Sequence, residues 1–199
     1  MSKDFWNKRY SEEQFAYGTN PNKFYKDQLD KLNPGKALFL GEGEGRNAVY
    51  AAKLGWQVDA VDFSESAKEK ALRLAKENNA VINYVVIDFE KYHFKKNYYD
   101  LVVMIFLHVP EETSKIIFQG SISSLKHGGK LLIETFSKEQ INNSSGGPKD
   151  PVLLFSEDEL LKLTSELKTD LLESKSIILD EGNYHKGNAG VIRFIGVKS

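Results

Sequence analysis

The stretch Ala37-Leu-Phe-Leu-Gly-Glu-Gly-Glu-Gly45 decides the fold, because an apolar β-type run ends there directly in a glycine-rich turn. A helical pattern follows over 47–54, with alanines on one face and Gly55 as its stop. A strand that enters a helix through such a turn is typical of a parallel α/β sheet. The stretch therefore predicts a strand, a turn and a helix, with a ligand site at the carboxyl end of the strand.

Outward from this turn, β-type runs continue to alternate with helical patterns. The further runs lie at 57–61, 82–87, 100–106 and 130–135. The run at 100–106 is apolar on both faces, as in a central strand covered by helices on both sides. A helix is expected to begin at Pro110 and to stop near Gly128. The alternation implies right-handed crossovers and a doubly wound α/β sheet.

Capping boxes predict where two more helices begin. One is Ser66 with Glu69, and the other is Ser156 with Glu159, whose helix would carry leucines at 160, 163 and 167. Residues 137–155 between strand and helix contain SSGGPKDP and are expected to form a long irregular loop, a length that is usually functional. Two β-rich stretches at 174–179 and 189–197 follow. Their connector, 180–188, is long for a tight hairpin.

Composition limits the class of protein. The 199 residues fit one domain, with 1–35 as an aromatic N-terminal cover segment and 36–199 as sheet and helices. The chain has no cysteine, which excludes disulfides, thiolate-held metals and a cysteine nucleophile. A formal charge of −1 lacks the basic excess of a nucleic-acid binder, and no apolar run is long enough to span a membrane. We expect a cytoplasmic monomer or homodimer with no nucleic-acid or membrane partner.

The glycine-rich turn itself constrains the ligand. A dinucleotide fingerprint would place its third glycine where this chain has Arg46, and the G-K-[ST] of a P-loop is absent. Glu42 and Glu44 would repel a pyrophosphate, whereas they suit a ligand with cationic groups. S-adenosylmethionine carries both a sulfonium and an ammonium. The alternative is a tight turn that binds no ligand.

Acidic residues end the next two strands. Asp62 lies 21 residues after Gly41, where a carboxylate can accept hydrogen bonds from both ribose hydroxyls. Its alternative role is helix capping, although Ser64 and Ser66 are better placed for that. Asp88 and Phe89 end the third run, where a carboxylate can accept from an adenine amino group and a ring can cover the base. An exposed aspartate at a strand end is the alternative.

With these features the sequence resembles the class I S-adenosylmethionine-dependent methyltransferases. Residues 40–47 (LGEGEGRN) and 60–64 (AVDFS) resemble motifs I and II, 99–110 (YDLVVMIFLHVP) the fourth-strand motif and 128–133 (GGKLLI) the fifth. A narrower resemblance is to the small tellurite-resistance and thiopurine-type methyltransferases. It rests on Phe5-Trp6…Arg9-Tyr10…Tyr17-Gly18…Pro21-Asn22 and on residues 181–187 (EGNYHKG).

The resemblance implies a doubly wound, mostly parallel, seven-stranded Rossmann-like sheet with an antiparallel C-terminal strand. It also implies a cofactor site for S-adenosylmethionine, which leaves as S-adenosylhomocysteine. The glycines at 41, 43 and 45 would wrap the methionine part, Asp62 the ribose, and Asp88 with Phe89 the adenine. Ile105 would lie on the methionine side, and Glu42, Asn47 and Phe63 complete the predicted set. Motif I usually has an acidic residue where this chain has Phe39, and Glu42 is the expected substitute.

The reaction is expected to be an in-line methyl transfer to a small-molecule acceptor. A hydroxyl acceptor would need a base or a metal, and residues 105–108 (IFLH) offer no acidic ligands for one. They also lack the [ND]-P-P-[YFW] pattern of DNA amino methyltransferases. We therefore expect no metal and a soft nucleophile, such as a thiol or a selenium or tellurium oxyanion.

Three side chains are candidates for a catalytic role. His108 could act as a base, contact the substrate or cap a loop, and His185 could cover the site or lie in a solvated turn. Arg46 could hold an anionic substrate or pair with Glu44. The N-terminal aromatic residues could form a lid or pack against the sheet. Two other functions stay open, namely a nicotinamide-dependent oxidoreductase on a related fold and a non-catalytic S-adenosylmethionine-binding module.

Overall fold

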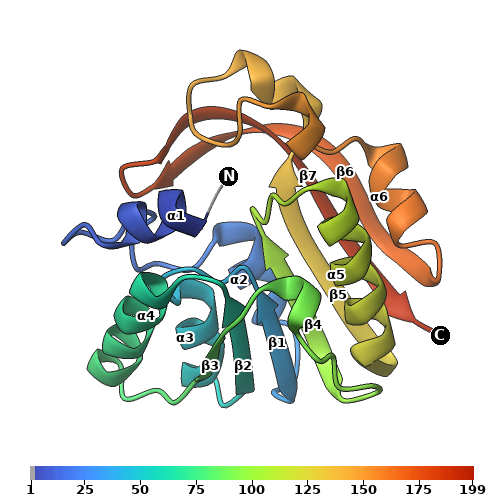
Figure 1. Cartoon of the computed structure of the whole chain (residues 1–199). Helices are drawn as coiled ribbons and strands as arrows, with labels where there is room; N and C mark the ends of the chain where they lie inside the picture. Colours follow the sequence, from blue (N-terminus) through green and yellow to red (C-terminus); the bar gives the residue numbers. More distant parts are fainter. Residues whose placement is uncertain (1–2) are drawn as a thin grey trace.

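One seven-stranded sheet runs through the computed structural model, which describes residues 3–199 (Figure 1). Its order is β3-β2-β1-β4-β5-β7-β6, and the first five strands are parallel to one another, whereas β7 is antiparallel to both β5 and β6. The strands are β1 Lys36–Leu40, β2 Gln57–Asp62, β3 Asn83–Val86, β4 Tyr99–Ile105, β5 Leu125–Phe136, β6 Leu167–Glu181 and β7 His185–Lys198. The predicted fold class is confirmed.

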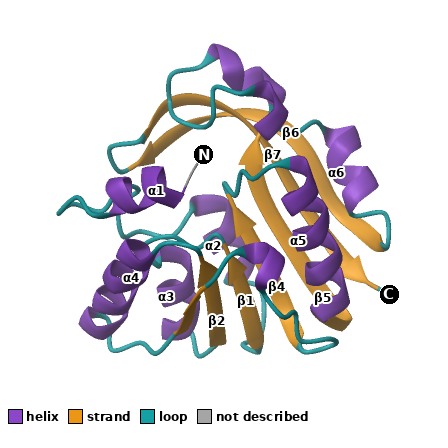
Figure 2. Ribbon diagram, in the orientation of Figure 1, coloured by secondary structure: helices purple, strands orange, loops and turns teal. Residues whose placement is uncertain are grey.

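Helices cover both faces of the sheet, as Figure 2 shows. They are α1 Lys3–Tyr10, α2 Lys23–Leu29, α3 Arg46–Lys53, α4 Glu65–Glu77, α5 Glu111–Ser124 and α6 Glu157–Leu163, with 3₁₀ turns η1 Phe89–Lys91, η2 Lys138–Asn142 and η3 Pro151–Leu153. Successive residues of a central strand pack into the two hydrophobic cores on opposite faces of the sheet. In β1, Phe39 packs with α2, α3 and α4, whereas Leu38 and Leu40 pack with α5 and α6. This alternation is the two-residue period of a strand buried on both faces.

Two predicted helix boundaries are wrong at α4 and α5. The N-cap of α4 is Ser64, whose hydroxyl accepts from the Ala67 amide, while Ser66 lies inside the helix and forms no capping box with Glu69. The chain turns into the helix two residues after Asp62, which leaves Ser64 as the last residue with extended backbone angles. Helix α5 ends at Ser124 rather than near Gly128, because β5 already begins at Leu125.

The C-terminal region also differs from the prediction. The capping box of Ser156 with Glu159 is confirmed, but α6 ends at Leu163 and Leu167 is the first residue of β6. The expected connector 180–188 is strand on both sides of a tight turn, since Glu181 pairs with His185 across it. Its polar residues hid the strand, because Lys186 and Asn188 face solvent while His185 and Ala189 are buried.

The carboxyl edge of the parallel strands is covered from two sides. Helix α1 lies beside α4 at this edge, and residues 137–155 arch over it from the other end, together with the β6–β7 turn (Figure 1). A parallel bridge between Ser137 and Phe155 closes the arch at its base. Inside it, the buried Gln140 amide donates to Ser145 Oγ and to the Gly146 carbonyl and accepts from the Gly190 amide. The arch is therefore irregular in backbone but internally bonded.

The choice between the two serines before α4 can be tested by stability. Replacing Ser64 with alanine removes the acceptor of the Ala67 amide and should lower the free energy of unfolding by about 0.5–2 kcal/mol. Ser66→Ala is the matched control and should change it by less than about 0.5 kcal/mol, since alanine suits a helix interior. Urea unfolding of both variants measures the difference. Equal effects would contradict the assignment of Ser64 as the cap.

Candidate functional site

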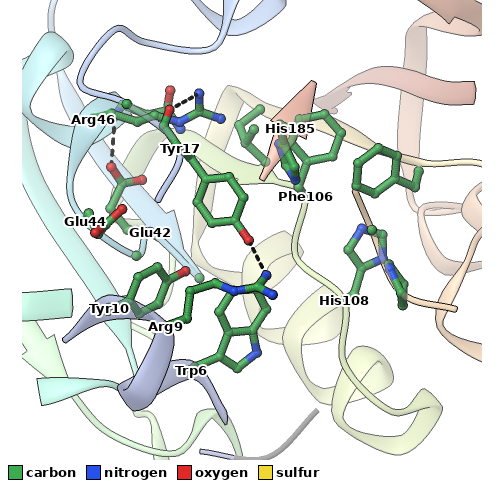
Figure 3. A pocket seen from close by; sticks show the side chains of 18 of the residues that line it. Trp6, Arg9, Tyr10, Tyr17, Glu42, Glu44, Arg46, Phe106, His108 and His185 are labelled. Carbon is green, nitrogen blue, oxygen red and sulfur yellow. Dashed lines mark hydrogen bonds between the residues drawn. The ribbon is translucent and has the colours of Figure 1, made fainter. Parts of the chain in front are cut away.

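A cavity of about 120 Å³ lies at the carboxyl edge of the strands, where the glycine-rich turn was predicted to place it (Figure 3). Its walls come from segments far apart in the sequence: residues 5–18, the turn 41–47, the end of β4 at 105–108, the residues Gly147 and Pro148 of the arch, Phe136 and His185. Of the predicted site residues, the cavity brings together Gly41, Glu42, Gly43, Arg46, Asn47, Ile105, His108 and His185.

Three positions of the turn after β1 require glycine. Gly41, Gly43 and Gly45 all have positive φ angles, of 67°, 61° and 90°. A β-carbon on Gly41 would lie 2.6 Å from Leu107, and one on Gly45 would lie 2.7 Å from the β-carbon of Ala71. Gly45 thus packs against α4 and does not line the cavity. At Gly43 the equivalent space is filled by the Tyr10 hydroxyl, 2.9 Å from where a β-carbon would stand.

Glu42 holds the start of α3. Its Oε1 accepts from the amides of Asn47 (3.0 Å) and Ala48 (2.7 Å), which are free donors at a helix N-terminus. Burial raises the pKa of Glu42 to about 8, although these hydrogen bonds and the charge of Arg46 oppose the shift. The carboxyl group therefore has a structural role and also forms part of the cavity wall.

The expected ion pair between Arg46 and Glu44 is absent from residues 3–199. Glu44 pairs instead with Lys70 of α4 at 2.8 Å and accepts from the Ala16 amide, also at 2.8 Å. Arg46 pairs with Glu181 at the end of β6 at 2.8 Å. The two side chains leave the turn in different directions, one toward α4 and one toward β6. Neither partner is close in the sequence, so the pattern of the turn could not reveal it.

Asp62 is buried beside the turn. One carboxylate oxygen accepts from the Ser64 amide and the other from the Gly43 amide, both at 3.0 Å. Burial raises the pKa of Asp62 to about 6, against the effect of these backbone hydrogen bonds. Asp62 does not line the cavity. Its negative charge contributes to the raised pKa of Tyr10, whose hydroxyl covers Gly43.

The predicted adenine-binding residues lie outside the cavity wall. Asp88 is about half exposed and pairs with Lys91 at 3.0 Å. Phe89 is buried in the core beneath α5, and its ring lies edge-to-face with Phe63 at 6.3 Å. The structure therefore does not bring this group together with the residues of the turn.

Aromatic rings form the half of the cavity away from the turn. The Phe106 ring lies 4.5 Å from Phe136 and 4.8 Å from His185, and Tyr17 lies 4.4 Å from His185. Phe106 has a φ of 53°, a strained angle for a residue of this kind, and such strain is often found at functional sites. Sequence reasoning did not single out Phe106, Phe136 or Arg9. For Arg9 the motif with Trp6 and Tyr10 was a signal, whereas Phe106 could have been found only by its place directly after β4.

The two histidines of the cavity are held by different partners. His108 Nδ1 lies 2.8 Å from the Leu153 carbonyl oxygen of η3, and burial lowers the pKa of His108 to about 4. His185 is buried in β7 rather than in a solvated turn, and its Nδ1 lies 3.3 Å from Glu181 Oε2. Burial opposes ionisation of Glu181, but the His185 hydrogen bond and the Arg46 charge outweigh it and lower the pKa of Glu181 to about 2.

Among residues 3–199, no helix is long and apolar enough to cross a lipid bilayer. The same part of the chain contains no group of three histidine, aspartate or glutamate side chains arranged to hold a metal ion.

Comparisons with known proteins agree with one another. A family model described as a methyltransferase domain matches residues 37–129. An uncharacterized methyltransferase of Schizosaccharomyces pombe is 35% identical over 113 residues, which are 56% of this chain and 77% of that protein. The probable S-adenosyl-L-methionine-dependent methyltransferase TehB of Haemophilus influenzae is 25% identical over 136 residues, 65% of this chain and 47% of TehB.

The solved structures add the fold. The crystal structure of TehB from Haemophilus influenzae superposes with a TM-score of 0.74 at 20% sequence identity, and the match covers 99% of this chain and 67% of that one. In the sequence comparison the chain matches about half the length of TehB. The structural match to TehB covers nearly all of this chain, whereas the sequence match covers 65% of it.

Proposed function

The chain belongs to the class I S-adenosylmethionine-dependent methyltransferases, and we propose that it transfers a methyl group from S-adenosylmethionine to a small-molecule acceptor in the cavity. The observation that carries the proposal is the positive-φ glycine turn at the end of β1, with Glu42 and Glu44 in the cavity wall. Backbone at this place can approach a ligand closely, and carboxyl groups favour one that carries positive charge.

The residues of the turn fit the methionine end of this cofactor. Gly41, Gly43, Asn47 and Ile105 line the same part of the wall, beside Glu42. Asp62 has two carboxylate oxygens that are held in place by backbone amides, and each can accept a further bond from a ribose hydroxyl. Gly45 would act by shaping the turn. Phe63, Asp88 and Phe89 remain the proposed adenine side, reached once Tyr10 leaves the space above Gly43.

Binding requires the cover to move. The cavity of about 120 Å³ is well below the roughly 300–1,000 Å³ of ordinary ligand pockets. Trp6, Tyr10 and Tyr17 pack in a small separate cluster with Ala67 and Tyr184, not in either large core. Segments with few core contacts open at low free-energy cost. We therefore assign the N-terminal segment the role of a lid over the site.

The bound cofactor supplies an activated methyl group, so the protein has to align the acceptor and exclude water. The rings of the distal half and the lid can do both. Among residues 3–199 no acidic cluster stands ready for a divalent metal, and this favours an acceptor that is nucleophilic without one. A thiol or a selenium or tellurium oxyanion has that property.

An acceptor screen tests the proposed function. The protein is incubated with S-adenosylmethionine and a panel of small thiols and selenium or tellurium oxyanions, and formation of S-adenosylhomocysteine is measured. We expect turnover with at least one acceptor, and we expect that turnover to survive EDTA. Binding of NAD but not of S-adenosylhomocysteine in calorimetry would instead support an oxidoreductase, and rescue by Mg²⁺ after EDTA would replace the soft acceptor with a metal-assisted one.

Asp62 should make cofactor binding depend on pH. Ribose hydroxyls donate to the carboxylate and favour its ionised form, so the pKa of Asp62 should fall from about 6 when S-adenosylhomocysteine binds. The contribution of Asp62 to affinity should then be complete well above pH 6 and weaken as the pH falls through 6, because a proton must leave before binding, whereas a change near pH 8 would belong to Glu42. Calorimetry between pH 5 and 8 measures this dependence.

The matched variants for this titration are Asp62→Asn and Asp158→Asn, the second on the exposed surface of α6. At pH 7.5, Asp62→Asn should lose about 1.5–3 kcal/mol of binding free energy, the usual range for hydrogen bonds to a charged group. The change in affinity near pH 6 should disappear in the same variant. Asp158→Asn should bind as the wild type does. A folded Asp62→Asn protein with wild-type affinity at every pH would remove Asp62 from the site.

If the N-terminal segment is a lid, its hydrogen exchange should depend on bound ligand. Amides between Trp6 and Asn22 should exchange more slowly when S-adenosylhomocysteine and an acceptor are bound, because the lid then closes on ligand instead of on an almost empty cavity. Amides of α6 serve as the control and should not change. Deleting residues 1–10, which end with α1 and precede the anchored part of the segment, should strongly reduce turnover while the melting temperature changes little. Identical exchange of Trp6 to Asn22 with and without ligand would mean that the segment is ordinary packing.

A further inference from the structure

We propose that the acceptor is a small planar acid that keeps a hydrogen-bond donor: its O–H, N–H or S–H group donates to His108 Nε2, and its anionic group binds Arg9. The inference rests on the proposed function, because it names the class of acceptor for the same cavity. Two side chains that line the cavity carry it: His108 has a hydrogen-bond acceptor without a partner, and Arg9 has a positive charge without a paired carboxylate.

The hydrogen-bonding state of His108 is fixed by its partner. Its Nδ1 lies 2.8 Å from the Leu153 carbonyl oxygen, and a carbonyl oxygen only accepts, so Nδ1 carries the proton. Nε2 is then a lone-pair acceptor. It is buried and has no hydrogen-bond partner among residues 3–199, although the ring lines the cavity. An unsatisfied buried acceptor is destabilising, and a ligand that donates to it would recover that loss.

His108 is also neutral in the neutral pH range, since burial lowers its pKa to about 4. The ring therefore cannot attract an anion at Nε2. A thiolate or a fully deprotonated oxyanion placed there would oppose lone pair with lone pair. The part of the acceptor that faces His108 must accordingly retain a hydrogen atom.

Arg9 would bind the anionic group at the other end of the acceptor. Its guanidinium lies over the rings of Tyr184 (4.1 Å) and Phe5 (4.6 Å), and Nη1 donates to the Tyr17 hydroxyl at 3.0 Å. Within residues 3–199, no carboxylate lies at ion-pair distance from Arg9, whereas Arg46 is paired with Glu181. Arginine presents five N–H donors in a planar fork, so several are left for an anion with two oxygens.

The residues between Arg9 and His108 indicate the shape of the part of the ligand that joins its two polar groups. Figure 3 shows Arg9 and His108 on opposite sides of the cavity, with the rings of Tyr17, Phe106 and His185 bordering it. These flat walls favour a flat apolar body. Because the proposed cofactor shares this cavity, the acceptor has to be small, and a single aromatic ring has the flat faces that such walls can cover.

Binding of substituted benzoates to the cofactor-loaded protein tests the inference. Calorimetry first measures binding of S-adenosylhomocysteine, and the loaded protein is then titrated with the three hydroxybenzoates. Benzoate lacks the donor, the methoxybenzoates cap it and phenol lacks the anion. One hydroxybenzoate isomer should bind at least about tenfold more tightly than its methoxy counterpart, benzoate and phenol. Equal affinities across the series would overturn the proposal.

Variants assign each preference to its side chain. His108→Asn keeps an amide donor for the Leu153 carbonyl and removes the Nε2 acceptor, so the hydroxybenzoate should fall to the affinity of benzoate, and benzoate itself should not change. Arg9→Gln should weaken both benzoates about 10- to 100-fold and leave phenol unaffected. His127→Asn and Arg73→Gln, both at exposed positions, are the matched controls and should bind as the wild type does.

A measurement on the wild-type protein covers the case in which a variant does not fold. Long-range ¹⁵N–¹H NMR at pH 7 should show the proton of His108 on Nδ1, and the Nε2 resonance should shift when the hydroxybenzoate binds. A proton on Nε2, or a hydroxyl preference that survives in His108→Asn, would overturn the inference. If S-adenosylhomocysteine binds and no probe does, the inference fails and the proposed function stands. If S-adenosylhomocysteine itself does not bind, the proposed function fails.

Discussion

The carboxyl group of Glu42 holds the first amides of α3, and Asp62 holds the amides of Gly43 and Ser64. Two buried acids thus fix the path of the turn on which the cavity depends. Burial opposes their ionisation and raises the pKa of Glu42 to about 8 and that of Asp62 to about 6. A cation bound beside the turn would favour both charged forms, because each unit of pKa corresponds to about 1.4 kcal/mol of interaction. The turn therefore becomes more negative in response to a positively charged ligand.

Local signals were enough to predict most of the sheet and the glycine-rich turn that lines the cavity. The glycines at 41, 43 and 45 and the apolar runs of the parallel strands depend on residues close in the sequence, and the structure has them where the pattern placed them. The errors depend on contacts that local pattern does not contain. Arg46 pairs with Glu181, 135 residues away, and the polar residues around His185 hid a strand that pairing with β6 creates. Phe106 has a positive φ at the point where its ring packs against Phe136 and His185, which are distant in the sequence.

One buried asparagine joins the N-terminal segment to the central and C-terminal strands beside the site. The Asn22 amide donates to Asn47 Oδ1 of α3, and its side chain donates to Glu134 of β5 and Glu181 of β6. Glu181 in turn binds Arg46 and His185. Buried polar networks of this kind are rigid when every member is satisfied, and removing one member leaves the others unpaired. This network fixes the distal half of the cavity relative to the glycine-rich turn.

This arrangement divides the N-terminal segment into a fixed part and a movable part. Residue Asn22 is held by the network, and the Ala16 amide donates to Glu44, so the chain is anchored from residue 16 onward. Helix α1 has fewer attachments, a hydrogen bond from Ser64 to Asn7 at 2.6 Å and the contacts of Arg9 with Tyr17 and Tyr184. Opening at α1 would uncover Gly43, because the Tyr10 hydroxyl covers it, and the Gly43 amide is the one that donates to Asp62. Movement of one helix is thus enough to expose the cofactor half, while the arginine that we assign to the acceptor travels with it.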